Sequence, residues 1–215
     1  MLNPALCLAG IAFLALGQNA MATTFRYDTD PFAGANVRNI PGRQVLGGED
    51  FLNFSVASDL FSLESTVFGV GGSVNFVNAL AANVPASGVN IVVLQSFDDD
   101  NNPLTPFGAG NAANLIAGHV IAPGPGFFIY FNQALDIPRL VYSTDLSSNT
   151  SDLRILARIL NLNGQTGRNA MSTFTAADFE ITTAATPTPE PSSIALIFPA
   201  ISAGFYWALR RRMRA

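Results

Sequence analysis

Short apolar runs, each bounded by Gly, Pro or Asn, constrain the fold of this chain more than any other feature. Residues 89–94, in which only Asn90 is polar, and residues 127–131 are short runs rich in β-branched or aromatic side chains, whereas residues 51–57 alternate apolar and polar positions. Continuous runs of this length are typical of strands buried on both faces, and alternating runs of strands buried on one. Residues 73–78 and 140–143 are two further candidate strands.

One segment fits two kinds of secondary structure. Apolar residues alternate through residues 153–162, as in a strand, but its two arginines, Arg154 and Arg158, would also share one face of a helix. The alternation favours a strand. Short helices are predicted at residues 112–116 and 176–179, where Thr175 could cap the second.

Many short strands without long helices between them predict an antiparallel β-sandwich, with a jelly roll as one form of it. The absence of a fixed-period repeat argues against a solenoid or a propeller. The 215-residue sequence divides into an N-terminal segment at 1–22, a central domain (the ectodomain) at 23–185 and a C-terminal segment at 186–215. An ectodomain of about 165 residues is a typical length for one domain.

The ectodomain is acidic and lacks cysteine. It contains seven Arg, no Lys and fourteen Asp or Glu, so its net charge is about −7. A surface of that sign repels phosphate backbones, and we therefore expect no nucleic acid as a partner. The only cysteine, Cys7, precedes the ectodomain, which predicts a domain without disulfides or thiolate metal sites.

The N-terminus has the pattern of a secretory signal. Residues 2–17 are apolar except for Asn3, and Ala20-Met21-Ala22 supplies the small residues that signal peptidase recognises. Cleavage is expected after Ala22. The protein is therefore predicted to be exported across the inner membrane.

The C-terminus combines three elements in order. Pro189-Glu190-Pro191 lies in a stretch that cannot be helical, because each Pro fixes φ and restricts the residue before it. Residues 194–209 carry no charge; as a helix they would span about 24 Å, somewhat short of the bilayer core. Arg210, Arg211 and Arg212 follow and are expected to stay on the cytoplasmic side. We predict a transmembrane helix at 194–209.

This order of a Pro-Glu-Pro triplet, a short apolar helix and an Arg cluster resembles the PEP-CTERM sorting domain of Gram-negative bacteria. The resemblance covers residues 188–215 and does not extend to the ectodomain. It implies recognition of Pro189, Glu190 and Pro191 by an exosortase, a membrane-embedded cysteine transpeptidase that would remove the tail. It also implies a transient membrane anchor and a destination at the cell surface or in a matrix that contains exopolysaccharide. Without processing, residues 194–209 would remain as a permanent tail anchor.

An acidic stretch is a candidate calcium site. Asp98-Asp99-Asp100-Asn101-Asn102 provides five consecutive side chains with oxygen ligands, which calcium prefers. The stretch lacks the spacing of an EF-hand, and Asp and Asn also satisfy the backbone groups of turns. A solvated turn is the favoured interpretation, and calcium binding is the alternative.

No catalytic constellation is evident from the sequence. His119 is the only histidine and no G-x-S-x-G pattern accompanies it, which disfavours Ser-His-Asp catalysis. Gly69-Val70-Gly71-Gly72 lacks the Lys of a phosphate loop and is predicted to be a turn. Carboxylates that could act in pairs on a glycosidic bond are Glu49, Asp50, Asp59, Glu64 and Asp136.

These patterns together predict a non-enzymatic, cofactor-free component of the cell surface or extracellular matrix. Its expected partners are signal peptidase, an exosortase, the inner membrane through residues 194–209 and exopolysaccharide. The alternative is a calcium- or carbohydrate-binding module. A hydrolase that uses two carboxylates is the third hypothesis.

Overall fold

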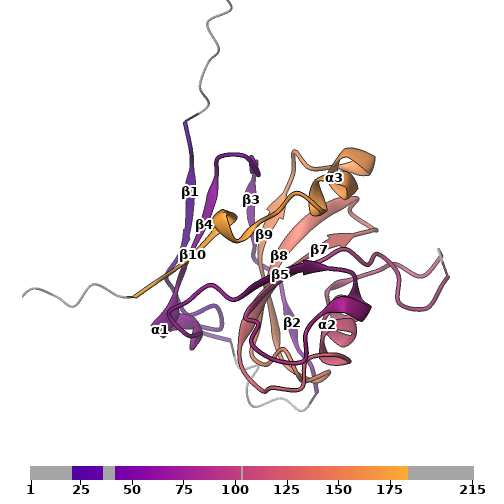
Figure 1. The fold of residues 1–215 in the computed structure, drawn as a ribbon, viewed down its shortest axis with the longest axis horizontal. Coiled ribbons are helices and arrows are strands. Elements are labelled where there is room, and N and C mark those ends of the chain that lie inside the picture. Colours follow the sequence, from indigo (N-terminus) through magenta and orange to yellow (C-terminus); the bar gives the residue numbers. More distant parts are fainter. Residues whose placement is uncertain (1–20, 36–41, 103, 184–215) are drawn as a thin grey trace, which may run out of the picture. The chain divides into compact units, whose positions relative to one another are not determined.

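The computed structural model describes residues 21–35, 42–102 and 104–183 (Figure 1). The chain divides into two units, Met1–Thr183 and Ala184–Ala215, and the described residues all belong to the first. None of the helices in this described part is long and apolar enough to cross a membrane. The helix expected at 194–209 lies outside it.

The larger of two sheets is mixed. Its centre is antiparallel, because β7 pairs with β8 and β8 with β9, while parallel pairs lie on both sides of that centre. β5 and β6 continue the sheet beyond β7, and both β2 and β3 pair with β9. The strands are β2 (Val45–Leu46), β3 (Asp50–Leu52), β5 (Phe76–Ala79), β6 (Ile91–Leu94), β7 (Gly126–Asn132), β8 (Ile137–Ser143) and β9 (Leu153–Ile159).

The smaller sheet is entirely parallel and joins the two ends of the described unit. Its strands are β1 (Thr24–Tyr27), β4 (Leu60–Glu64) and β10 (Phe179–Thr182), with β4 in the middle. The first and last strands therefore depend on the same central strand for their hydrogen bonds.

Three α-helices are present in the described part: α1 (Ser65–Phe68), α2 (Ala109–Ala117) and α3 (Gly164–Met171). Two 3₁₀ turns, Ala81–Asn83 and Ala176–Asp178, complete the regular structure. α1 follows β4 directly, and α2 lies in the connection between β6 and β7, as Figure 1 shows.

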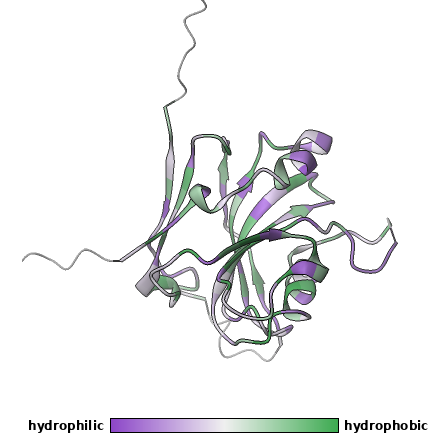
Figure 2. Ribbon diagram, in the orientation of Figure 1, coloured by the Kyte–Doolittle hydropathy of each residue, from purple (hydrophilic) through white to green (hydrophobic). Residues whose placement is uncertain are grey.

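Apolar cores lie on both faces of the larger sheet, whose central strands are mostly apolar in Figure 2. Ile91 and Phe127 belong to the core shared with the smaller sheet, whereas their neighbours Val92 and Phe128 belong to the core shared with α2. Phenylalanine dominates the layer between the sheets, where the rings of Phe54 and Phe61 stack with centroids 4.3 Å apart. Other rings in that layer are Phe25, Phe174 and Phe179.

The predicted antiparallel sandwich, and with it the jelly roll, is wrong. Six of the eight strand pairings in the described part are parallel. A parallel pair needs a crossover connection, and α2 provides one between β6 and β7. The runs at 89–94 and 127–131 were the relevant signal, because neither alternates and a strand covered on both faces, here by a second sheet and a helix, needs no polar alternation.

Several individual elements were predicted correctly. The runs at 89–94 and 153–162 contain β6 and β9, the run at 127–131 lies within β7, and the run at 140–143 is the last part of β8. The helix predicted near 112–116 lies within α2. Thr175 caps the turn at Ala176–Asp178 through a 3.3 Å hydrogen bond from the Ala177 N–H.

Two predicted strands were too long. The strand expected at 51–57 ends at Leu52, because Ser55 and Asp59 form a turn in which the Ser55 N–H donates to the Asp59 carboxylate. The strand expected at 73–78 begins only at Phe76.

Gly167 allows α3 to pack against the turn that precedes it. A Cβ at this position would lie 2.1 Å from the carbonyl oxygen of Leu162 and 3.0 Å from the ring of Phe131. We expect Gly167→Ala to lower the free energy of unfolding by about 2–3 kcal/mol, because the backbone must shift. Urea denaturation measures the change.

Gly110 in α2 provides the matched control. A Cβ there would meet nothing closer than the Arg43 guanidinium at 3.7 Å, and Ala has the higher helix propensity. Gly110→Ala should therefore be neutral or stabilise by less than about 1 kcal/mol. Equal effects of the two substitutions would contradict the close approach at Gly167.

Candidate functional site

The carboxyl ends of β1, β4 and β10 meet at one edge of the smaller sheet. The parallel register places Tyr27 beside Leu63, and Thr182 beside Glu64. Ligand sites of parallel sheets lie at such edges, because the connections leaving the strands converge there. Two hollows lie next to this edge and share the side chain of Phe68.

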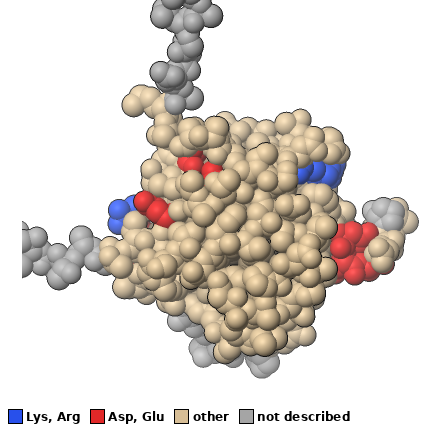
Figure 3. Space-filling view, viewed as in Figure 1, with Lys and Arg blue, Asp and Glu red and all other residues tan. Residues whose placement is uncertain are grey.

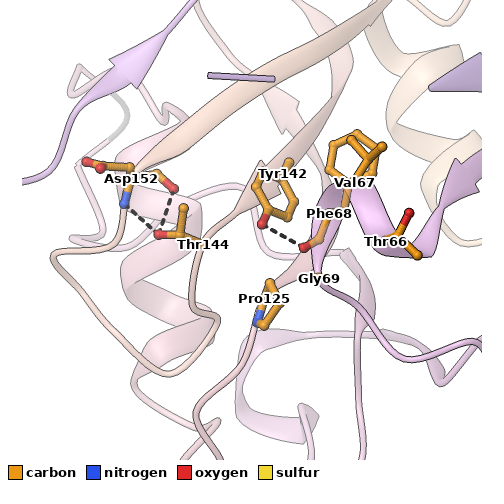
Figure 4. A pocket seen from close by; sticks show the side chains of 8 residues that line it. All are labelled: Thr66, Val67, Phe68, Gly69, Pro125, Tyr142, Thr144 and Asp152. Carbon is orange, nitrogen blue, oxygen red and sulfur yellow. Dashed lines mark hydrogen bonds between the residues drawn. The ribbon is translucent and has the colours of Figure 1, made fainter. Parts of the chain in front are cut away.

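The first hollow has a volume of about 490 Å³ and lies between α1 and the β8–β9 side of the larger sheet (Figure 4). Its polar groups serve the fold. The Tyr142 hydroxyl donates to the Phe68 carbonyl at 2.8 Å, and the Thr144 hydroxyl accepts from the Asp152 N–H at 3.1 Å. Lining residues are Thr66, Val67, Phe68, Gly69, Pro125, Tyr142, Thr144 and Asp152.

Glu64 builds one wall of this hollow by holding α1. Its side chain is buried at the end of β4, and one carboxylate oxygen accepts from the Val67 N–H at 2.8 Å and the Thr66 hydroxyl at 2.6 Å. Gly69 ends the helix with φ +66°, a conformation that glycine adopts without strain. The predicted turn at Gly69 is thus a helix end, and Glu64 is a helix cap.

The second hollow is smaller, about 200 Å³, and has charged walls. Tyr27 and Asp50 line it together with Arg154, which forms no ion pair or hydrogen bond with other described residues. The Arg154 guanidinium lies against Gly48, where a Cβ would be only 3.0 Å from its Nη2. Further lining residues are Thr29, Asp30, Pro31, Ala33, Gly48, Phe68, Ile155 and Leu156.

Tyr27 is held in its neutral form at this hollow. Burial raises the pKa of its phenol, and the nearby Asp50 carboxylate raises that pKa further. The Tyr27 hydroxyl is enclosed and makes no hydrogen bond of normal geometry in the described part. A cation and a carboxylate on the walls of a small hollow are complementary to a ligand that carries both an anionic group and a hydrogen-bond donor.

A buried carboxylate joins the edge of the larger sheet to its centre. The Glu49 side chain is only 5% exposed, and its Oε1 pairs with Arg139 at 2.6 Å and with Arg158. Oε2 accepts from the Gly48 N–H at 2.8 Å. Burial alone would raise the pKa of Glu49, but hydrogen bonds from its own backbone, Arg158, Gly48 and Arg139 lower it to about 2. Glu49 therefore neutralises two arginines that face each other across β8 and β9.

The acidic loop is the red cluster that Figure 3 shows at one edge of a largely uncharged face. One oxygen from each of Asp98, Asp99 and Asp100 lies within 4.8 Å of the others. However, Asp98 Oδ1 accepts the N–H groups of Asp100 and Asn101, both at 3.0 Å. A hydrogen bond from the Asn102 N–H similarly lowers the pKa of Asp100. These bonds are those of the turn that the sequence favoured, and calcium binding stays the untested alternative.

The other candidate residues lie apart from the two hollows. His119 is exposed just after α2, and Asp136 pairs with Arg168 at 3.1 Å. Asp59 accepts backbone N–H groups at the start of β4. The sorting-signal residues Pro189, Glu190, Pro191, Arg210, Arg211 and Arg212 lie outside the described residues.

No family model, curated protein or solved structure matches this chain. Of the candidate carboxylates, Asp50 alone lines the second hollow, and sequence reasoning did not single out its companions Tyr27 and Arg154. Tyr27 and Arg154 come from strands of different sheets. Only the apolar alternation within residues 153–162 indicated that Arg154 lies on the face opposite Leu153 and Ile155, which belong to the core shared with α2.

The buried Glu49 predicts a specific acid sensitivity. Because its folded pKa of about 2 lies below the ordinary value of 4.5, its contribution to stability is complete above pH 4.5 and is lost as the pH falls towards 2. Glu49→Gln should lower the free energy of unfolding at pH 7 by about 3 kcal/mol, since two arginines lose their anion. Denaturation curves from pH 2 to 7 measure both effects.

Asp28→Asn is the control, because Asp28 pairs with Arg26 on the surface, where the two side chains are 44% and 60% exposed. This substitution should change stability by less than about 1 kcal/mol. If Glu49→Gln retained the pH dependence of the unsubstituted protein below pH 4.5, the buried-anion assignment would be wrong.

Proposed function

We propose that this chain is an exported protein whose C-terminal signal is processed by an exosortase, after which the domain acts as a non-catalytic component of the cell surface or extracellular matrix. The observation that carries the proposal is the order of Pro189-Glu190-Pro191, the uncharged residues 194–209 and Arg210-Arg211-Arg212. Each part alone is common, but their order and spacing specify a signal for recognition, insertion and orientation.

The fold is compatible with removal of that signal. The last described strand, β10, ends at Thr182, and its pairing with β4 uses residues 179–182 alone. Cleavage near the triplet therefore leaves every described strand pairing intact. The mature domain would keep both of its apolar cores.

A structural role is supported by how the domain uses its carboxylates. Glu49 binds two arginines, Glu64 caps α1, Asp59 accepts backbone N–H groups and Asp136 pairs with Arg168. Four of the five carboxylates considered for hydrolysis thus serve the fold. Asp50 remains at the second hollow.

Replacement of Pro189, Glu190 and Pro191 by Ala tests the processing. In the producing bacterium the substituted protein should be larger than the processed form by the mass of the tail, because the exosortase no longer recognises it. It should also remain in the membrane fraction through residues 194–209. Immunoblotting of cell fractions measures size and location together.

A matched control replaces Thr186, Thr188 and Ser192 by Ala, which changes the same number of residues around the triplet. This control should be processed like the unsubstituted protein. Unchanged size and location of the triplet variant would contradict the proposal, as would an equal defect in the control.

A further inference from the structure

Asp59 is a buried carboxylate that meets only uncharged donors. It is 9% exposed in the turn before β4. Its Oδ2 accepts the Ser55 N–H at 2.8 Å, and its Oδ1 accepts the Thr23 N–H at 2.9 Å and the Ser58 hydroxyl at 3.3 Å. No arginine of the described part forms an ion pair with it. Buried charges are normally paired with an opposite charge, so this site lacks its cation.

Both backbone groups of Thr23 form hydrogen bonds to Asp59 or to the residue that follows it. Its N–H donates to Asp59, while its carbonyl oxygen accepts from the Leu60 N–H at 2.9 Å. Thr24 then begins the parallel pairing of β1 with β4. The residues before Thr23, Met21 and Ala22, are exposed. The Thr23 nitrogen therefore has a defined position, whereas the two described residues before it are exposed.

The sequence pattern predicts that signal peptidase cuts the bond between Ala22 and Thr23. Hydrolysis of that bond adds one water molecule: the carboxylate remains on Ala22, and the Thr23 nitrogen is released as an amine. At neutral pH this amine takes up a proton, because α-amino groups have pKa values near 8. The cut thus creates a cation at the nitrogen that lies 2.9 Å from Asp59.

We propose that Asp59 is the binding site for the mature N-terminal ammonium group of Thr23. The hydrogen bond that the precursor makes between a neutral amide and the Asp59 carboxylate becomes an ion pair after cleavage, which adds a Coulombic attraction to the bond. Export would then stabilise the smaller sheet at β1, because β1 is an edge strand whose one partner in the described part is β4. The proposal rests on the export step of the proposed function and is independent of exosortase processing.

The absence of lysine makes a clean test possible. Because the α-amino group is the only primary amine of the chain, an amine-specific reagent acetylates that group alone. Acetylation removes the charge but keeps one N–H, as in the precursor. In the protein that begins at Thr23 and ends at Ala215, acetylation should lower the melting temperature by about 3 °C. In Asp59→Asn the shift should fall below about 1 °C.

Asp28→Asn is the matched control, since it removes an exposed carboxylate that follows β1 and pairs with Arg26. It should retain the full acetylation shift. The absence of a shift in the unsubstituted protein, or an equal shift in Asp59→Asn, would overturn the proposal.

A second measurement does not depend on the folding of Asp59→Asn. The docked ammonium group of Thr23 should react with the acetylating reagent at least tenfold more slowly than the amine of a form that retains Ala22, whose terminus is exposed. Equal rates would overturn the proposal. Sequencing the N-terminus of the exported protein separates this proposal from the exosortase proposal, because a start other than Thr23 would overturn the role of Asp59 together with the cleavage site and leave C-terminal processing untouched.

Discussion

The central strands of the larger sheet are apolar on both faces, and the rest of the described structure follows from the need to cover them. Ile91 and Phe127 face one way, whereas Val92 and Phe128 face the other, and all four are fully buried. If either face were exposed to water, several large side chains would lose their burial, which stabilises the fold by about 2 kcal/mol for each side chain. The phenylalanine layer of the smaller sheet covers one face and α2 covers the other. The parallel crossover is therefore a consequence of the apolar pattern.

The smaller sheet makes the domain depend on both ends of its folded unit. β1 and β10 flank β4, so neither terminal strand can be lost without exposing part of the phenylalanine layer. Both expected processing sites lie just outside these strands: Ala22 precedes Thr24, and Pro189 follows Thr182. The domain boundaries and the processing signals are thus consistent with each other, although they come from separate observations.

The sequence predicted the elements that rest on local information. β6, β7 and α2 follow from apolar runs and from turn residues around them, and Thr175 caps its turn as expected. Strand direction could not be predicted, because it depends on which distant strands pair: β4 acquires partners from residues 24–27 and 179–182. The contacts of the charged residues could not be predicted for the same reason, because they also depend on distant parts of the chain. Arg154 and Tyr27 meet at one hollow only after two sheets have packed, and Glu49 is recognisable as a buried anion only once β8 and β9 bring Arg139 and Arg158 together.

The central claim is that this domain is released from temporary signals at both ends. The intact mass of the protein recovered from the surface of the producing bacterium tests it most directly. The account predicts a single chain that begins at Thr23 and ends before Ile194, apart from any group that the exosortase transfers to the new C-terminus. A mass that includes residues 194–215 in the mature protein would contradict it.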